Sequence, residues 1–230
     1  MLDSKKIVED YLHQKDWRVY ENSNAPFSFG AMQRYFGEEI AKDYWLRHIY
    51  PEPIAQAHID GDMHIHDLGG LTLYCCGYSL KTIIMKGVRG IPNIPTSAPA
   101  KHFASIINQI CNLATVFQNE IKGAVAFSSV DTLLAPFVKV DGLSYEEVKQ
   151  SMQNLVFSLN SNSRGGAEPA FTNMTFDLTP PKDLLNEKAW VGVEQKSFTY
   201  KECQQEMNMI NKAFCEIMIA GDSDCLLYTS

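Results

Sequence analysis

The sequence predicts an α/β protein in which short strands alternate with long helices. Three observations support this fold class. Apolar residues recur at helical spacing over long segments, capping boxes open two of these segments, and short apolar stretches between them end beside glycine. The chain has 230 residues, of which 45% are hydrophobic, which is enough for one sizeable core.

The helical segments are the clearest. Ser144 followed by Glu147, and Thr199 followed by Glu202, are capping boxes that begin two helices. Pro99 suits the first turn of another helix, in which apolar residues recur every three or four positions. The predicted helices cover residues 33–49, 99–118, 144–159 and 199–217.

The strand signals are shorter. The predicted strands are residues 63–65, 71–75, 124–127 and 170–176. Residues 87–99 contain three prolines and predict a long loop. We expect an N-terminal extension or linker at 1–20, one domain at 21–224, and a non-native tail at 225–230.

Composition excludes several classes of protein. With 20 basic and 27 acidic residues, the net charge of −7 argues against a nucleic-acid partner. The longest charge-free run, 103–119, is too polar and too short to span a membrane. The first residues lack the apolar segment of a secretory signal, so we expect a cytoplasmic protein with reduced thiols.

The densest polar cluster lies at residues 58–67, which include three histidines and three aspartates. Strand alternation would direct His64 and His66 to the same side. Imidazoles beside carboxylates bind zinc or iron, which leaves open a metal-dependent hydrolase that activates water. Because the spacing fixes no third ligand, we expect no metal here.

Two adjacent cysteines form the next candidate. In a strand, Cys75 and Cys76 would face opposite sides, so one enters a pocket while the other packs in the core. Gly77 allows another group to approach the backbone closely. An inert, buried thiol is the alternative for either residue.

A glycine pair marks the third candidate. Gly165 and Gly166 free backbone N–H groups for an anion, and Arg164 suits a phosphate or carboxylate. The alternative is a helix C-cap with Arg164 in solvent. For the chain as a whole, a non-catalytic nucleotide-binding module stays open as a second alternative function.

These candidates belong to an ordered set of motifs. The set comprises Tyr20-Glu-Asn-Ser-Asn24, Ala57-His58, Gly61-Asp62-Met-His64-Ile-His66-Asp67-Leu68, Tyr74-Cys75-Cys-Gly-Tyr-Ser-Leu80, Ala126-Phe-Ser-Ser-Val-Asp131-Thr-Leu-Leu-Ala-Pro-Phe137, Ser163-Arg164-Gly165-Gly166 and Pro169-Ala-Phe171-Thr172-Asn173-Met-Thr-Phe-Asp177. In this order the motifs resemble the anaerobic (class III) ribonucleoside-triphosphate reductases, over about residues 8–224.

The resemblance implies the N-terminal portion of a ten-stranded glycyl-radical-type α/β barrel with surrounding helices. It implies reduction of ribonucleoside triphosphates to deoxyribonucleoside triphosphates by a glycyl and thiyl radical mechanism. Cys75 matches the family cysteine on the substrate face opposite the thiyl radical, where it assists loss of the 2′ hydroxyl. A thiol suits this role because it is a weak acid and a one-electron donor.

The resemblance also implies substrate-binding residues and partners. We expect Asn24, His64 and His66 at the substrate pocket and Arg164 near its mouth. ATP or deoxynucleotide effectors would bind near Lys101 and His102, at a homodimer interface built on the helices at 99–118 and 144–159.

A radical-SAM enzyme is the expected activator. The resemblance places the glycyl radical and a structural zinc site outside this chain, so the fragment alone is expected to be inactive. Residues 225–230 resemble translated adapter sequence, and Cys225 is given no role.

Overall fold

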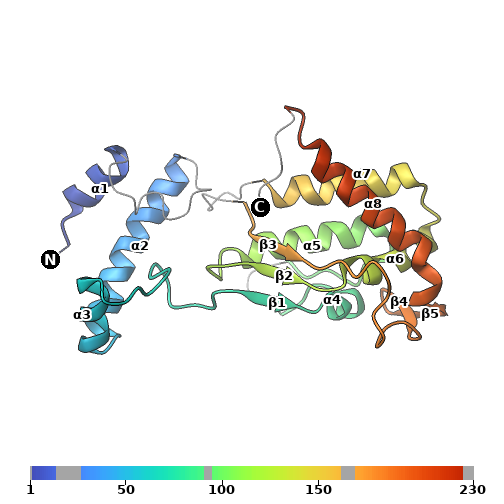
Figure 1. Cartoon of the computed structure of the whole chain (residues 1–230), viewed down its shortest axis with the longest axis horizontal. Coiled ribbons are helices and arrows are strands. Elements are labelled where there is room, and N and C mark those ends of the chain that lie inside the picture. Colours follow the sequence, from blue (N-terminus) through green and yellow to red (C-terminus); the bar gives the residue numbers. More distant parts are fainter. Residues whose placement is uncertain (1, 14–26, 91–94, 162–168, 225–230) are drawn as a thin grey trace. The chain divides into compact units, whose positions relative to one another are not determined.

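Figure 1 shows the computed structural model of the chain, which describes residues 2–13, 27–90, 95–161 and 169–224. The chain divides into two compact units. One consists of Met1–Tyr74 and Asn162–Pro169, and the other of Cys75–Ser161 and Ala170–Ser230. Each unit has its own hydrophobic cluster. The residue patterns within 21–224 gave no sign of this division.

The first unit contains the helices α1 (Ser4–His13), α2 (Phe29–His48) and α3 (Glu52–Asp60). Tyr11 of α1 is only 4% exposed and stacks on Phe27, with ring centroids 5.3 Å apart. Its hydroxyl donates to the carbonyl of Ser28 at 3.1 Å. Aromatic packing and this hydrogen bond hold α1 to the start of α2.

The prediction of a helix at 33–49 is confirmed by α2, which begins earlier because the Ser28 hydroxyl caps it, accepting from the Ala31 N–H. The predicted strand at 63–65 is wrong, since the backbone there is irregular. The Met63 N–H donates to the Ala57 carbonyl of α3, and the Ile65 N–H donates to His58 Nδ1. These donors point back to α3 instead of to a neighbouring strand.

The second unit is built on a three-stranded parallel sheet in the order β1-β2-β3 (Figure 1). Its strands are β1 (Cys76–Tyr78), β2 (Val125–Phe127) and β3 (Thr172–Met174). The predicted strands at 124–127 and 170–176 are confirmed in shorter form. The strand predicted at 71–75 is wrong, because pairing begins only at Cys76. The structure is therefore α/β, as predicted.

The second unit also contains five α-helices within the described residues. They are α4 (Leu80–Lys86), α5 (Phe103–Phe117), α6 (Val130–Asp141), α7 (Tyr145–Leu159) and α8 (Gln204–Ala220). Both predicted capping boxes are present, and the second opens a 3₁₀ turn at Tyr200–Cys203 before α8. Pro99 lies outside α5, which begins after His102. Among the described helices, none combines the length and apolarity needed to cross a bilayer.

An antiparallel hairpin, β4 (Lys188–Val191) and β5 (Glu194–Thr199), was not anticipated. Gly192 at its turn has φ +60°, and a Cβ placed there would lie 2.9 Å from the Ala100 carbonyl oxygen. Glycine therefore satisfies both the turn and the close approach of the segment that enters α5.

One buried carboxylate joins the carboxyl ends of the strands to two helices. Asp131, in the first turn of α6, has no exposed surface. It accepts hydrogen bonds from the backbone N–H groups of Thr132, Asp177 and Leu178 and from the Asn211 side-chain amide of α8, each at 2.9 Å. Four donors and a helix N-terminus compensate this buried charge.

The same cluster holds two residues in the left-handed region. Ser129 has φ +55° and Leu178 has φ +63°, although neither is glycine. The Ser129 N–H donates to the Thr175 hydroxyl at 2.9 Å, and the Thr132 hydroxyl donates to the Asp177 carboxylate at 2.6 Å. Such strained turns persist when their surroundings fix them from several sides. The carboxyl ends of β2 and β3 are thus firmly tied together.

Candidate functional site

The two faces of the parallel sheet differ. Cys76 and Tyr78 pack against the core cluster, and Tyr78 stacks on Phe117 of α5 with ring centroids 4.1 Å apart. On the opposite face, Gly77, Ala126 and Asn173 are paired in one row across the strands. Gly77 and Asn173 are exposed. This second face, which we call the open face, carries small side chains in its middle row.

Cys75 lies at the amino edge of the open face. Its side chain is exposed, and its Sγ accepts a hydrogen bond from the Ala124 backbone N–H at 3.2 Å. Cys76 is only partly exposed and belongs to the core side. The structure therefore separates the two thiols as alternation predicts, and the catalytic role of Cys75 stays a prediction.

Two other thiols, those of Cys111 and Cys203, are buried, unlike that of Cys75. Burial raises the pKa of Cys111 to about 11 and that of Cys203 to about 12. Both thiols stay protonated near neutral pH and suit a structural role. Burial also raises the pKa of Tyr78 to about 12, with a smaller contribution from Cys76. The Cys111 and Cys203 thiols and the Tyr78 phenol are therefore uncharged near neutral pH.

The histidine cluster belongs to the first unit. His64 Nε2 and His66 Nδ1 lie 3.3 Å apart, although no strand places them there. His66 Nε2 lies 3.4 Å from the Asp67 carboxylate. His58 and His64 are among the residues that line a cavity of about 620 Å³ bordered by α2 and α3. The two predicted histidines are brought together, beside a space that is large enough for a small molecule.

The described residues do not assemble a metal site here. Among them, no group of three or more histidine, cysteine, aspartate or glutamate side chains is arranged to hold a metal ion. The hydrolase alternative requires such ligands around an activated water. It therefore gains no support from His64 and His66.

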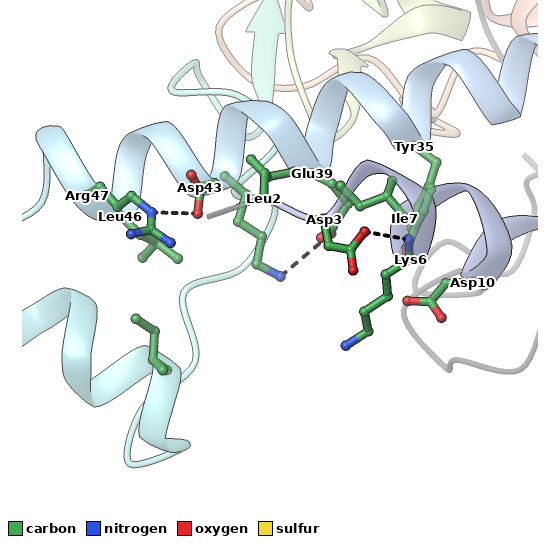
Figure 2. Close-up of a pocket in the computed structure, with 12 residues that line it drawn as sticks. Leu2, Asp3, Lys6, Ile7, Asp10, Tyr35, Glu39, Asp43, Leu46 and Arg47 are labelled. Carbon is green, nitrogen blue, oxygen red and sulfur yellow. Dashed lines mark hydrogen bonds and ion pairs between the residues drawn. The ribbon is translucent and has the colours of Figure 1, made fainter.

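A second cavity of about 430 Å³, drawn in Figure 2, is lined mainly by α1 and α2. Its wall carries charges of both signs. Arg47 Nε lies 2.7 Å from the Asp43 carboxylate, and Lys42 lies 3.9 Å from Glu39. Because these charges pair along the helix, they present no surface of one sign to a ligand.

The expected effector residues lie where α5 begins. His102 is the N-cap, but its side chain makes no capping bond. Instead the Asp141 carboxylate accepts from the Phe103 N–H at 2.8 Å and lies 2.9 Å from His102 Nδ1. Lys101 is exposed nearby. The Phe103 N–H at the start of α5 is thus already paired with Asp141, and the effector role of Lys101 and His102 stays a prediction.

Two predicted site residues, Asn24 and Arg164, lie outside the described residues, as do Gly165, Gly166 and Cys225. Two further residues of interest were missed. Asn173 was quoted only as part of a motif, yet it supplies the polar side chain in the middle row of the open face. Asp131 was likewise quoted without a role. The pairing register that would have marked Asn173 is not encoded in local sequence.

The structure thus defines an α/β protein. Its candidate site is an exposed thiol at the edge of a parallel sheet, with small residues beside it. Comparison with known proteins narrows this class. The chain belongs to the anaerobic ribonucleoside-triphosphate reductase family, whose model matches residues 21–227.

Named relatives agree with this assignment. The anaerobic ribonucleoside-triphosphate reductase of Escherichia coli K12 is 29% identical over 104 residues, covering 43% of this chain and 14% of that protein. The enzyme of the same name from phage T4 is 24% identical over 199 residues, covering 75% of this chain and 32% of that protein. The chain thus spans a third or less of these relatives.

The fold also matches solved structures. The Thermotoga maritima anaerobic ribonucleotide reductase with glycerol in its active site has a TM-score of 0.65 at 18% identity, covering 94% of this chain and 41% of that one. The same enzyme in complex with dATP and CTP has a TM-score of 0.59 at 18% identity, covering 93% and 42%. These likenesses concern the fold.

Proposed function

We propose that this chain is the N-terminal portion of the catalytic barrel of an anaerobic ribonucleoside-triphosphate reductase. The observation that carries the proposal is the exposed Cys75 thiol on the open face, within a chain of this family. In the complete enzyme the open face would form part of the inner wall of a ten-stranded barrel. Its small residues, Gly77 and Ala126, leave room for a substrate above β1 and β2.

In this proposal Cys75 assists loss of the substrate's 2′ hydroxyl as water, a step that needs a proton and reducing equivalents. We assign the glycyl and thiyl radicals of this mechanism to other parts of the complete enzyme. His64, His66, Asn24 and Arg164 remain the proposed substrate-binding residues, and none of them is assigned a metal. The structural zinc is likewise assigned to other parts of the complete enzyme.

The experiment is an anaerobic assay of the complete enzyme that contains this chain, after activation by a radical-SAM enzyme. Conversion of ribonucleoside triphosphates to deoxyribonucleoside triphosphates is expected. Nucleotide binding without conversion, by an activated enzyme that carries its glycyl radical, would favour the non-catalytic binding module instead.

We also assign dimerisation to α5 and α7. Ala104, Ser105, Asn108 and Asn112 are exposed on α5 and carry no charge. Exposed helix faces normally carry charged residues, so this uncharged face suits contact with a second copy of the chain. Phe157 of α7, a helix that packs against α5, is 62% exposed and also carries no charge. In this cytoplasmic homodimer, ATP or deoxynucleotide effectors would bind near the start of α5.

Replacement of Lys101 by alanine tests the effector site. If an effector phosphate lies at the start of α5, Lys101→Ala should weaken binding about fivefold, the factor that corresponds to about 1 kcal/mol for a charge at a helix end. The measurement is equilibrium binding of dATP to the complete enzyme, with Lys188→Ala as a surface control. Unchanged affinity together with unchanged substrate preference would remove α5 as the effector site.

A further inference from the structure

The amino edge of the parallel sheet departs from a regular ladder at Cys75. In a parallel pair, the N–H and C=O of one residue bond to the residues on either side of its partner. Cys76 pairs with Val125, which places Cys75 opposite Ala124. The Ala124 carbonyl accepts from the Cys76 N–H at 3.0 Å, as the ladder requires. Its N–H would then donate to the carbonyl of Tyr74.

That donor instead bonds to sulfur. The Ala124 N–H donates to Cys75 Sγ at 3.2 Å. The thiol has therefore replaced a main-chain carbonyl as the acceptor that begins the ladder. The donor itself is held in place, because the ladder bond from Cys76 and the bond from the Val125 N–H to the Phe171 carbonyl, at 2.9 Å, fix the backbone on its carboxyl side.

We propose that the Ala124 backbone N–H is a positioning group for the Cys75 sulfur. It fixes rotation about the Cα–Cβ bond and occupies one lone pair, so that the S–H bond points away from the donor. When the S–H bond breaks and its electron pair stays on sulfur, the N–H donates to the resulting negative charge. The use of this proton on a substrate rests on the proposed function, whereas the hydrogen bond does not.

The neighbouring Cys76 thiol meets a backbone acceptor instead of a backbone donor. Cys76 Sγ faces the Gly77 carbonyl oxygen at 4.0 Å, as a weak donor. The Gly77 carbonyl can only accept from the Cys76 thiol, whereas the Ala124 N–H donates to the Cys75 sulfur. Two adjacent cysteines are thus distinguished by the backbone groups that they meet.

The first test measures amide hydrogen exchange of the whole chain by NMR. In Cys75→Ala the Ala124 N–H should exchange about fivefold faster or more relative to the Val125 N–H, the factor expected for loss of one ordinary hydrogen bond. Cys75→Ser retains an acceptor and should keep most of the protection, and Cys76→Ala should leave the ratio unchanged. An unchanged ratio in Cys75→Ala would show that this hydrogen bond is absent. A general loss of stability speeds exchange of both neighbouring amides, so it cancels in the ratio.

The second test measures charge on sulfur. Replacing the peptide bond between Gly123 and Ala124 by an ester removes the Ala124 N–H and keeps the Gly123 carbonyl. Alkylation of Cys75 by iodoacetamide at neutral pH, followed by peptide mass spectrometry, should slow several-fold, while the exposed Cys215 of α8 reacts at its original rate. Equal rates at Cys75 would overturn the proposal. Neither measurement uses a nucleotide, so its failure is distinguishable from failure of the proposed function.

Discussion

Asp131→Ala is expected to lower the unfolding free energy of the second unit by about 3–5 kcal/mol, at the upper end of single substitutions. The substitution leaves four hydrogen-bond donors without their acceptor in a fully buried position. It also releases two turns whose left-handed residues, Ser129 and Leu178, rely on this cluster. Few other side chains of the described structure join so many elements.

Urea unfolding followed by Trp190 fluorescence measures this effect, in a background where Trp17 and Trp45 are replaced by phenylalanine. Trp190 then reports on the second unit alone. Asp131→Asn keeps the shape of the side chain but places an amide NH₂ group opposite hydrogen-bond donors. The unfolding free energy of this variant should therefore lie between those of wild type and Asp131→Ala. The exposed Asp183→Ala is the control, with little effect expected. A loss below about 1 kcal/mol in Asp131→Ala would mean that the cluster contributes little.

Cys75→Ser is expected to lower deoxynucleotide formation by the complete enzyme at least about a hundredfold, the lower range for loss of a proton-transfer group. Serine is nearly isosteric, and its hydroxyl still accepts the Ala124 N–H. However, a hydroxyl is a much weaker acid than a thiol and a poor one-electron donor. The measurement is anaerobic turnover of an enzyme with a verified content of glycyl radical.

Cys76→Ser is the matched control, because it makes the same chemical change one residue away. Cys76 packs against the core, so its replacement should reduce stability and leave most of the turnover. Full turnover by Cys75→Ser would exclude a chemical role for the Cys75 thiol. Equal losses in both variants would indicate a structural effect on β1.

The helices were more predictable than the strands because their signals are local. The capping boxes at Ser144 and Thr199 lie within four residues, and both are formed. Each strand of the parallel sheet has only three residues, which is too short for a repeat of two to be distinctive. The prediction of a strand at 71–75 was therefore wrong, because pairing with β2 begins only at Cys76.

The site was predictable in its residue types but not in its long-range contacts. Cys75 stood out because of its family motif and its neighbour Cys76. Asp131, in an apolar helix, gave no local sign that three of its four partners lie 46 to 80 residues further along the chain. The place of Asn173 depends on the register between strands that are also far apart in sequence. Such contacts are decided by tertiary packing, which local patterns do not encode.

The brevity of the parallel strands has a consequence for the behaviour of the protein in concentrated solution. β1 and β3 are the outer strands of the described sheet, and outer strands are templates on which other chains can assemble into aggregates. A strand of three residues offers so few unpaired N–H and C=O groups that another protein molecule gains little free energy by pairing with it. A covalently connected strand, held nearby at high local concentration, can still gain enough to pair. Short outer strands thus admit growth of the sheet within one protein while discouraging it between proteins.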